Sequence, residues 1–308
     1  MEASITLKKV GKLAGDRTVL AGMSFGVERG TLVAIIGDND SGKSTLLRVL
    51  AGYERPEYGS VYVHGLDSVK RRRETSRMVA FVPHEPDFDP WLTVEQNIRF
   101  IGLLHKLPDQ LILQRLAGYS KQLGISDFLH ENASGLSLGI LKRALIVRAL
   151  VQDPQVLIID EPTAFMDADA RRMVWELLTG MHGQRTIIYA SQSLEEVETA
   201  NDRILVLHNG HMVLDGTLEK LLATTNQYHH FQIEFDGLTD ALYKELAAVS
   251  TVVNPSRVGD SFHFYGRSRR AFFHVIKKAA DSVLSDFSIK TLGLKDLMDS
   301  NYARRGLE

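Results

Sequence analysis

The 308-residue sequence contains no cysteine, which excludes disulfide bridges, thiolate metal sites and a cysteine nucleophile. Long hydrophobic runs are also missing, because the longest apolar stretches, 32–36 and 156–159, are far below the roughly 20 residues of a membrane-spanning helix. The first residues, MEASITLKKV, lack the apolar core of a signal peptide. We therefore expect a cytoplasmic chain that neither crosses a membrane nor is exported.

A large excess of charge of one sign is missing as well. The net charge is -2, so no overall positive field attracts nucleic acid or anionic lipid, and we expect no nucleic-acid partner. Hydrophobic residues make up 44% and charged residues 24%, which is ordinary for a globular protein. The length favours two domains.

Apolar, β-branched runs alternate with helical patterns through the first two thirds of the chain, which predicts a mostly parallel sheet covered by helices. Between 93 and 134 the strand pattern disappears, so we expect a helical insertion and a helical subdomain at about 85–150. The expected strands are 4–10, 31–36, 60–63, 78–83, 156–160, 186–191 and 203–208, and the expected helices are 44–50, 138–151, 168–181 and 194–200.

A polar stretch at 223–227 predicts a linker between a domain at 1–222 and a second domain at 228–308. The second half follows the order βαββαβ, which is typical of an α+β, ferredoxin-like domain. Its expected elements are strand 228–235, helix 239–248, strand 250–254, strand 261–265, helix 268–284 and strand 287–292.

The segment GDNDSGKST, at 37–45, follows an apolar strand and opens a helix, as the phosphate-binding pattern G-x-x-x-x-G-K-[ST] requires. Glycines let consecutive N–H groups converge on phosphate oxygens, and the positive end of the helix reinforces the site. Lys43 would add a charge to the β and γ phosphates, and the Ser44 hydroxyl would bind Mg²⁺. The expected ATP-binding residues are Gly37, Asp38, Asn39, Asp40, Ser41, Gly42, Lys43, Ser44 and Thr45.

A second motif, VLIIDEP, is an apolar strand that ends in two carboxylates. Asp160 would hold Mg²⁺ through water, and Glu161 would orient or deprotonate the attacking water. Two acids at the end of a buried strand are costly unless they serve a site. Together with the phosphate loop, the motif indicates ATP hydrolysis.

A third motif, SGLSLGILKR, precedes the helix that leads to the acidic strand, with Ser137 as its N-cap. The order of phosphate loop, helical insertion, LSLGI, IIDEP and AFMD over residues 4–222 resembles the ATP-binding subunits of ABC transporters. The leucine at the third position of LSLGI resembles the form of this motif in the antibiotic-exporting subfamilies. The ending TLGLKDLMDSNY is similar to exporter ATPases with a small C-terminal domain.

This resemblance implies a subunit that hydrolyses ATP with Mg²⁺ at the cytoplasmic face of a membrane and powers a separate permease subunit. It also implies a head-to-tail dimer in which Ser137, Leu138 and Gly139 contact the nucleotide of the partner. Asp167, in AFMD, resembles the D-loop aspartate of the family.

Three positions depart from the family pattern. His84 stands where a glutamine usually senses Mg²⁺. Two interpretations are open: His84 is a metal ligand, or it is a loop residue without a special role. Gln192 replaces the histidine that contacts the γ phosphate; it can donate a hydrogen bond but cannot take up a proton, which predicts slow hydrolysis. In the family an aromatic residue usually stacks on adenine in the region of Leu13 and Ala14, where this sequence has none. Loss of that stacking would cost about 1–3 kcal/mol of nucleotide affinity.

Two other functions are compatible with parts of the sequence. The first is an ATP-gated assembly subunit that hydrolyses little, which Gln192 and His84 favour. The second is a soluble ABC protein in translation or DNA maintenance. A single phosphate loop argues against the translation factor, and the 117 residues from Lys43 to Asp160, without heptads, argue against the chromosome ATPase.

Overall fold

The computed structural model describes residues 3–193, 196–197, 201–225, 229–266, 269–279 and 284–291. The chain divides into two compact units, Met1–Asp215 and Gly216–Glu308. The predicted linker at 223–227 is wrong at its start, because helix α8 (Leu218–Thr225) continues to Thr225. Its leucines at 218, 221 and 222 fall at helical spacing, which outweighs the polar threonines.

The first unit contains a six-stranded sheet in the order β10-β9-β3-β8-β7-β6. The pairs β3/β8, β3/β9, β6/β7 and β7/β8 are parallel, which confirms the predicted parallel sheet. Every residue of β3, β7 and β8 is buried, as continuous apolar runs predict. The strands are β3 (Leu32–Gly37), β6 (Val79–Val82), β7 (Val156–Asp160), β8 (Thr186–Ser191), β9 (Arg203–His208) and β10 (His211–Gly216).

A second sheet of the same unit has the order β2-β1-β4-β5, and the pairs β1/β2, β1/β4 and β4/β5 are antiparallel. The expected strands 4–10 and 60–63 lie here, so their assignment to the parallel sheet was wrong. The sequence pattern missed β2, whose alternation of buried and less buried residues is interrupted by Ala21 and Gly22, between Leu20 and Met23. The strands are β1 (Ala3–Ala14), β2 (Arg17–Glu28), β4 (Tyr58–Val63) and β5 (Leu66–Asp67).

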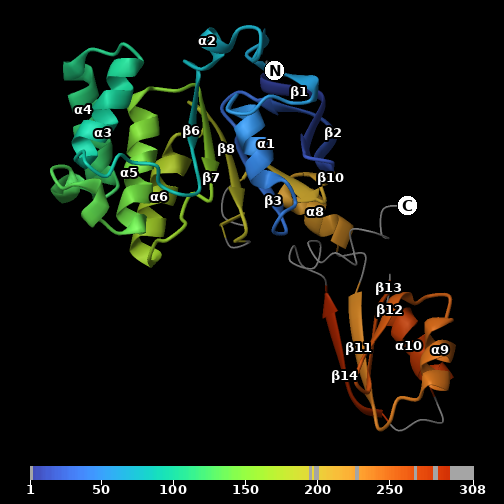
Figure 1. Ribbon diagram of the computed structural model, residues 1–308. Coiled ribbons are helices and arrows are strands. Elements are labelled where there is room, and N and C mark those ends of the chain that lie inside the picture. Colours follow the sequence, from blue (N-terminus) through green and yellow to red (C-terminus); the bar gives the residue numbers. More distant parts are fainter. Residues whose placement is uncertain are drawn as a thin grey trace. The chain divides into compact units, whose positions relative to one another are not determined.

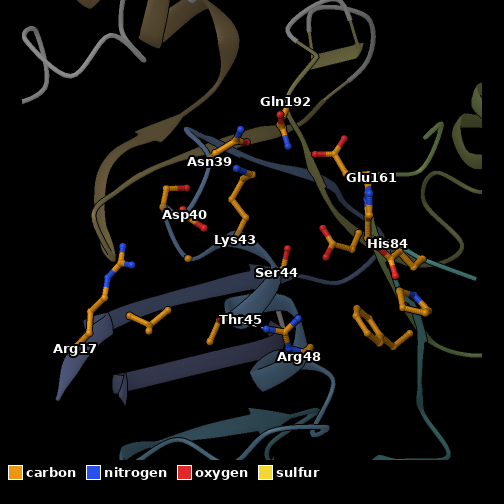
Figure 2. A pocket seen from close by; sticks show the side chains of 17 residues that line it. Arg17, Asn39, Asp40, Lys43, Ser44, Thr45, Arg48, His84, Glu161 and Gln192 are labelled. Carbon is orange, nitrogen blue, oxygen red and sulfur yellow. Dashed lines mark hydrogen bonds between the residues drawn. The ribbon is translucent and has the colours of Figure 1, made fainter. Parts of the chain in front are cut away.

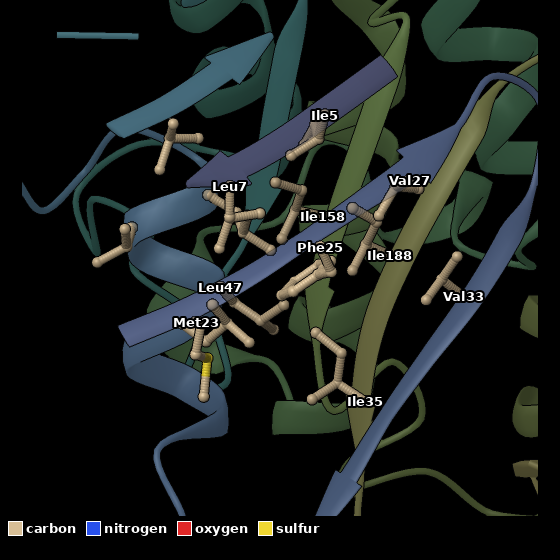
Figure 3. Packing of buried hydrophobic residues seen from close by; sticks show 14 of the residues in the cluster. Ile5, Leu7, Met23, Phe25, Val27, Val33, Ile35, Leu47, Ile158 and Ile188 are labelled. Atoms are coloured by element: carbon tan, nitrogen blue, oxygen red, sulfur yellow. The ribbon is translucent and has the colours of Figure 1, made fainter. Parts of the chain in front are cut away.

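The core of the first unit lies where the two sheets and helix α1 (Lys43–Leu50) meet (Figure 3). Ile5 and Phe25 come from the antiparallel sheet, Ile35 and Ile158 from the parallel sheet, and Leu47 from the helix. This packing fixes the start of α1 against the end of β3, because both elements bury apolar faces in one cluster.

The predicted helical insertion is confirmed between β6 and β7, which are neighbours in the parallel sheet. Figure 1 shows α3, α4 and α5 grouped together beside these strands. The helices of the unit are α2 (Arg72–Thr75), α3 (Val94–Leu104), α4 (Asp109–Gln122), α5 (Leu138–Val151) and α6 (Ala168–Gly180), with 3₁₀ turns at Ser126–Phe128 and Ala133–Gly135. Of the expected helix 194–200, only residues 196–197 belong to the described part of the chain, and they are helical.

The second unit has an antiparallel sheet in the order β12-β13-β11-β14. Phe231, Phe262 and Phe264 are fully buried in its own core. The expected helix 268–284 is too long, because Leu284 already begins β14. The elements are β11 (His229–Phe235), α9 (Asp240–Ala247), β12 (Val253–Val258), β13 (Ser261–Gly266), α10 (Arg269–Lys278) and β14 (Leu284–Thr291).

Residues 292–302, which carry most of the TLGLKDLMDSNY motif, lie outside the described residues. Within the described ranges, no helix combines the length and the apolar character that a membrane span requires.

Candidate functional site

The phosphate loop connects β3 to α1, and two of its positions accept only glycine. A Cβ atom on Gly37 would lie 2.3 Å from the carbonyl oxygen of Leu207. Gly42 has φ 101°, and its Cβ would lie 2.8 Å from the carbonyl oxygen of Val19. The loop is therefore held close to neighbouring backbone while its helix start faces the pocket.

Lys43 is 7% exposed, and its ammonium group donates to the carbonyl oxygens of Gly37 and Asp38, each at 2.7 Å. Burial lowers the pKa of Lys43, while the carboxylates of Glu161 and Asp160 raise it. The lysine is thus a buried positive charge that faces two acids across the loop, and incoming phosphate oxygens could replace the carbonyls as its acceptors.

The two carboxylates of the acidic motif follow each other at the end of β7. Asp160 is 4% exposed, and Glu161 adopts a left-handed backbone with φ 52° while its N–H donates to Ala190 at 2.9 Å. Burial raises the pKa of Glu161, and a hydrogen bond from the backbone N–H of Gln192 lowers it. Glu161 Oε1 is buried and has no hydrogen-bond partner among the described residues. An unsatisfied oxygen in this position suits a group that binds or deprotonates a ligand.

These parts line one pocket of about 840 Å³ (Figure 2). Gly37 and Asp38 do not line the pocket, but their carbonyl oxygens accept hydrogen bonds from Lys43. The sequence-predicted residues in the lining are Asn39, Asp40, Ser41, Gly42, Lys43, Ser44, Thr45, His84, Asp160, Glu161 and Gln192. The lining residues that sequence reasoning missed are Arg17, Val19, Arg48, Phe81, Pro83 and Glu85.

Arg17 begins β2, the strand that the pattern failed to predict, and this explains why the residue was missed. Neither Leu13 nor Ala14 lines the pocket. The alternating apolar residues Met23, Phe25 and Val27, all of them buried, were the available signal for this strand.

His84 and Gln192 reach the pocket from the ends of two strands of the parallel sheet. His84 follows β6, and its ring lies 5.3 Å from that of Phe165. The segment with Gln192 follows β8 and is anchored by Glu196, whose carboxylate accepts from Ser191 Oγ at 2.7 Å and from Thr163 Oγ1. Glu196 therefore connects the segment of Gln192 to the loop after Glu161.

The predicted signature residues lie away from this pocket. Ser137 is the N-cap of α5, where its Oγ accepts from the N–H of Ile140 at 3.4 Å. Leu138 is 50% exposed, whereas Gly139 packs so closely that a Cβ would lie 2.5 Å from the carbonyl oxygen of Phe165. Asp167 caps α6 through its Oδ1, which accepts from Ala170 at 2.8 Å, and it also stands outside the lining.

The pocket chemistry fits a magnesium nucleotide. Mg²⁺ prefers hard oxygen ligands, and Ser44 and Asp160 both present oxygens to the pocket. Phosphates suit the start of α1, its backbone N–H groups and Lys43. His84 offers nitrogen, which Mg²⁺ prefers less than oxygen.

Comparison with known proteins gives the same family over most of the chain. A family profile described as ABC transporter matches residues 20–164. The ABC transporter ATP-binding protein NatA of Bacillus subtilis is 31% identical over 216 residues, which cover 70% of this chain and 85% of NatA. The Nod factor export ATP-binding protein I of Ralstonia nicotianae is 29% identical over 280 residues, which cover 90% of this chain and 86% of that protein.

Solved structures agree with the sequence relatives. The structure of an ATP-binding subunit of an ABC transporter is 26% identical with a TM-score of 0.67, and it covers 71% of this chain and 92% of its own. A second structure is cbiO1 from Clostridium perfringens, part of the ABC transporter complex cbiONQ. It is 28% identical with a TM-score of 0.63, and it covers 72% of this chain and 92% of its own. This chain belongs to the ABC transporter family, as an ATP-binding subunit.

Proposed function

We propose that this protein hydrolyses ATP to drive export through a separate membrane permease. The observation that carries the proposal is the single pocket in which Lys43, at the start of α1, faces the buried acids Asp160 and Glu161. The names of two sequence relatives, a Nod factor export protein and an ABC transporter ATP-binding protein, support export as the direction and transport as the purpose.

The residues of the phosphate loop and of the ends of β7 and β8 divide the steps of this reaction among them. The N–H groups of the phosphate loop and the Lys43 ammonium bind the β and γ phosphates and stabilise the charge that develops on them. Ser44 would hold Mg²⁺ directly and Asp160 would hold it through water, and the bound ion would neutralise phosphate charge. Glu161 accepts the proton of the attacking water with its unpaired Oε1, and Gln192 donates a hydrogen bond toward the γ phosphate.

The test is turnover by the purified protein with its Glu161→Gln variant. The amide cannot accept a proton, so the variant is expected to bind Mg-ATP and to lose about 100-fold or more in kcat, the scale of a general base. Glu131→Gln, which changes an exposed carboxylate outside the pocket, is the matched control and keeps wild-type kcat. Equal turnover by wild type and Glu161→Gln contradicts the assignment.

A second subunit completes the site in this proposal. Ser137 and Leu138 are exposed at the positive end of α5 and outside their own pocket, a placement that supports contact with the γ phosphate of a partner. ATP added to Glu161→Gln is expected to convert monomer to dimer in light-scattering chromatography. Ser137→Arg, which puts a bulky side chain at that contact, is expected to remain monomeric while it still binds ATP.

The permease is proposed to dock on a groove of about 600 Å³ between the helical insertion and the parallel sheet. Leu92, Phe100 and Ile101 supply its apolar wall, and Phe100 is 55% exposed. A groove with an apolar wall beside polar and charged residues suits a short amphipathic segment. Phe100→Glu is expected to abolish co-purification with a co-expressed permease, whereas Leu113→Glu on α4 is expected to preserve it.

A nucleotide-gated subunit with weak hydrolysis is the second candidate, and Gln192 in place of an imidazole is the observation that favours it. Gln192→His restores a group that can take up a proton. A gain of about tenfold or more in kcat would support an impaired native site. An unchanged rate would favour the first candidate.

We further propose that residues 1–222 form the ATP-binding cassette and residues 228–308 an accessory, ferredoxin-like domain. The element order βαββαβ and the strand order β12-β13-β11-β14 support that assignment for the second unit. The protein would then act as a peripheral subunit at the cytoplasmic face of the membrane, where its permease lies. Fractionation of cells with and without the permease gene tests this location.

A further inference from the structure

Lys142 is a fully buried lysine, with 0% of its surface exposed, on helix α5. Its ammonium group donates to the carbonyl oxygens of Asp160 at 2.6 Å, Pro83 at 2.5 Å and His84 at 3.1 Å. An ammonium group has three donors, and each of them has one acceptor here. Lys142 is therefore held by backbone carbonyls, and its hydrogen-bond partners among the described residues include no carboxylate.

The three acceptors belong to the edge of the sheet that forms the nucleotide pocket. Asp160 ends β7, Pro83 and His84 follow β6, and these two strands are parallel neighbours with Val82 opposite Ile159. All three acceptor residues line the pocket themselves. One buried charge thus connects α5 to both segments that carry the candidate metal and water ligands.

The same end of α5 contacts His84 by a second route. Gly139 packs against the carbonyl of Phe165, and the ring of Phe165 lies 5.3 Å from the ring of His84. Phe165 has a left-handed backbone with φ 67°, as has Glu161 with φ 52°. Because these conformations are strained for residues other than glycine, the surrounding contacts must hold them in place.

We propose that Lys142 is a positioning residue that keeps the Asp160–Glu161 peptide and the Pro83–His84 peptide in register with the signature helix α5. Glu161 directly follows the Asp160 carbonyl, so the direction of that carbonyl sets the direction of the catalytic carboxylate. A movement of α5, whose Ser137 end is exposed, is then transmitted to the chain's own pocket through Lys142. This inference rests on the proposed hydrolysis and adds a coupling route to it.

The first test is Lys142→Met, which keeps length and apolar volume but removes the ammonium group. We expect kcat to fall about 10- to 100-fold, the scale of a misplaced catalytic group. Affinity for Mg-ATP should stay within about threefold, since the phosphate loop is unchanged. A parallel loss of affinity and kcat, or an unchanged kcat, overturns the proposal. Lys121→Met, on the exposed side of α4, is the control and retains both values.

A chemical rescue separates the charge from the shape of the side chain. Since the sequence has no cysteine, Lys142→Cys introduces a single thiol. Alkylation in denaturant with 2-bromoethylamine, followed by refolding, restores an ammonium of nearly the length of lysine, whereas 1-bromopropane gives an uncharged side chain of the same shape. We expect the aminoethyl form to approach the kcat of refolded wild type and the propyl form to resemble Lys142→Met. Equal rates for the two forms overturn the proposal.

Hydrogen exchange followed by mass spectrometry supplies a readout that does not depend on turnover. In Lys142→Met and in the propyl form, peptides that cover 83–85 and 160–163 are expected to exchange faster than in wild type, and the aminoethyl form restores the wild-type rate. Peptides from 229–266, in the second unit, serve as the internal control. If wild type shows no turnover while exchange changes in this way, hydrolysis fails and the coupling stands. Unchanged exchange at both segments contradicts the coupling.

Discussion

The backbone N–H of Gln192 donates a hydrogen bond to the carboxylate of Glu161. Both residues line the nucleotide pocket, although β7 and β8 carry them from separate parts of the sequence (Figure 2). The bond favours the ionised carboxylate, but burial has the larger effect and raises the pKa of Glu161 above its ordinary value. A carboxylate held in this way costs stability when it is ionised and becomes more basic toward water.

This raised pKa predicts a pH-dependent effect of Glu161→Gln on stability. Above the folded-state pKa the buried carboxylate is ionised at a cost, so at pH 7 the variant should have the higher free energy of unfolding. The advantage shrinks as the pH falls through the folded-state pKa and disappears below the ordinary value of 4.5, where the group is protonated in both states. Urea titrations of wild type and variant, without nucleotide or metal, measure this difference in the free energy of unfolding at pH 7 and at about pH 4. The same difference at both pH values would refute the effect.

The φ of 101° at Gly42 predicts that Gly42→Ala damages the phosphate loop. An alanine there is strained, and its Cβ would lie 2.8 Å from the Val19 carbonyl, so we expect a loss of about 1–3 kcal/mol in stability and a weaker affinity for Mg-ATP. Gly118→Ala on α4 is the control, because its Cβ meets open space in a helix and should stabilise by about 0.5–1 kcal/mol. Thermal unfolding and calorimetric titration distinguish the two. Equal effects of both substitutions would contradict the strain at Gly42.

The buried ammonium of Lys43 predicts a large effect of Lys43→Ala on nucleotide affinity. Loss of one charge-assisted contact to phosphate costs about 1.5–3 kcal/mol, which is roughly 10- to 150-fold in Kd. Lys121→Ala removes an exposed lysine of α4 and should leave Kd unchanged. Titration with a fluorescent ATP analogue measures both values. An affinity of Lys43→Ala equal to wild type would exclude Lys43 as a phosphate ligand.

The aromatic core of the second unit predicts a local effect of Phe231→Ala. Phe231 is fully buried, and its ring centroid lies 4.9 Å from that of Phe264 and 6.0 Å from that of Phe272. Removal of this ring should therefore lower the free energy of unfolding by about 3–5 kcal/mol. The nucleotide pocket lies in the other unit, and we expect Mg-ATP affinity to remain. Phe273→Ala, at a residue that is 65% exposed, should change stability by less than about 0.5 kcal/mol. Peptide-resolved hydrogen exchange shows where the loss occurs. Exchange that rises equally in both units would contradict a local core.

Much of the fold followed from local patterns. The run VLIID predicts the buried strand β7, and LGILKRALIVRALV predicts α5 with correct bounds, because continuous burial and helical spacing leave a clear sequence pattern. Strand β2 was missed, since Ala21 and Gly22 interrupt its alternation between Leu20 and Met23. Leu284 was placed in a helix and lies in β14, where pairing with Phe235 decides its conformation. Pairing partners are distant in sequence, so local propensity does not contain them.

The sequence by itself determined the chemistry of the phosphate loop and of the acidic strand end, because each is a short segment whose residue types carry the function. Only the tertiary structure decided which residues share the pocket: Arg17 joins it, and Ser137 and Asp167 stand outside it. It also placed the Lys142 ammonium against Asp160 and His84, which no spacing rule indicates. The physical reason is that a buried charge needs acceptors around it. These lie at the end of β7 and directly after β6, two segments that only folding brings to the same sheet edge.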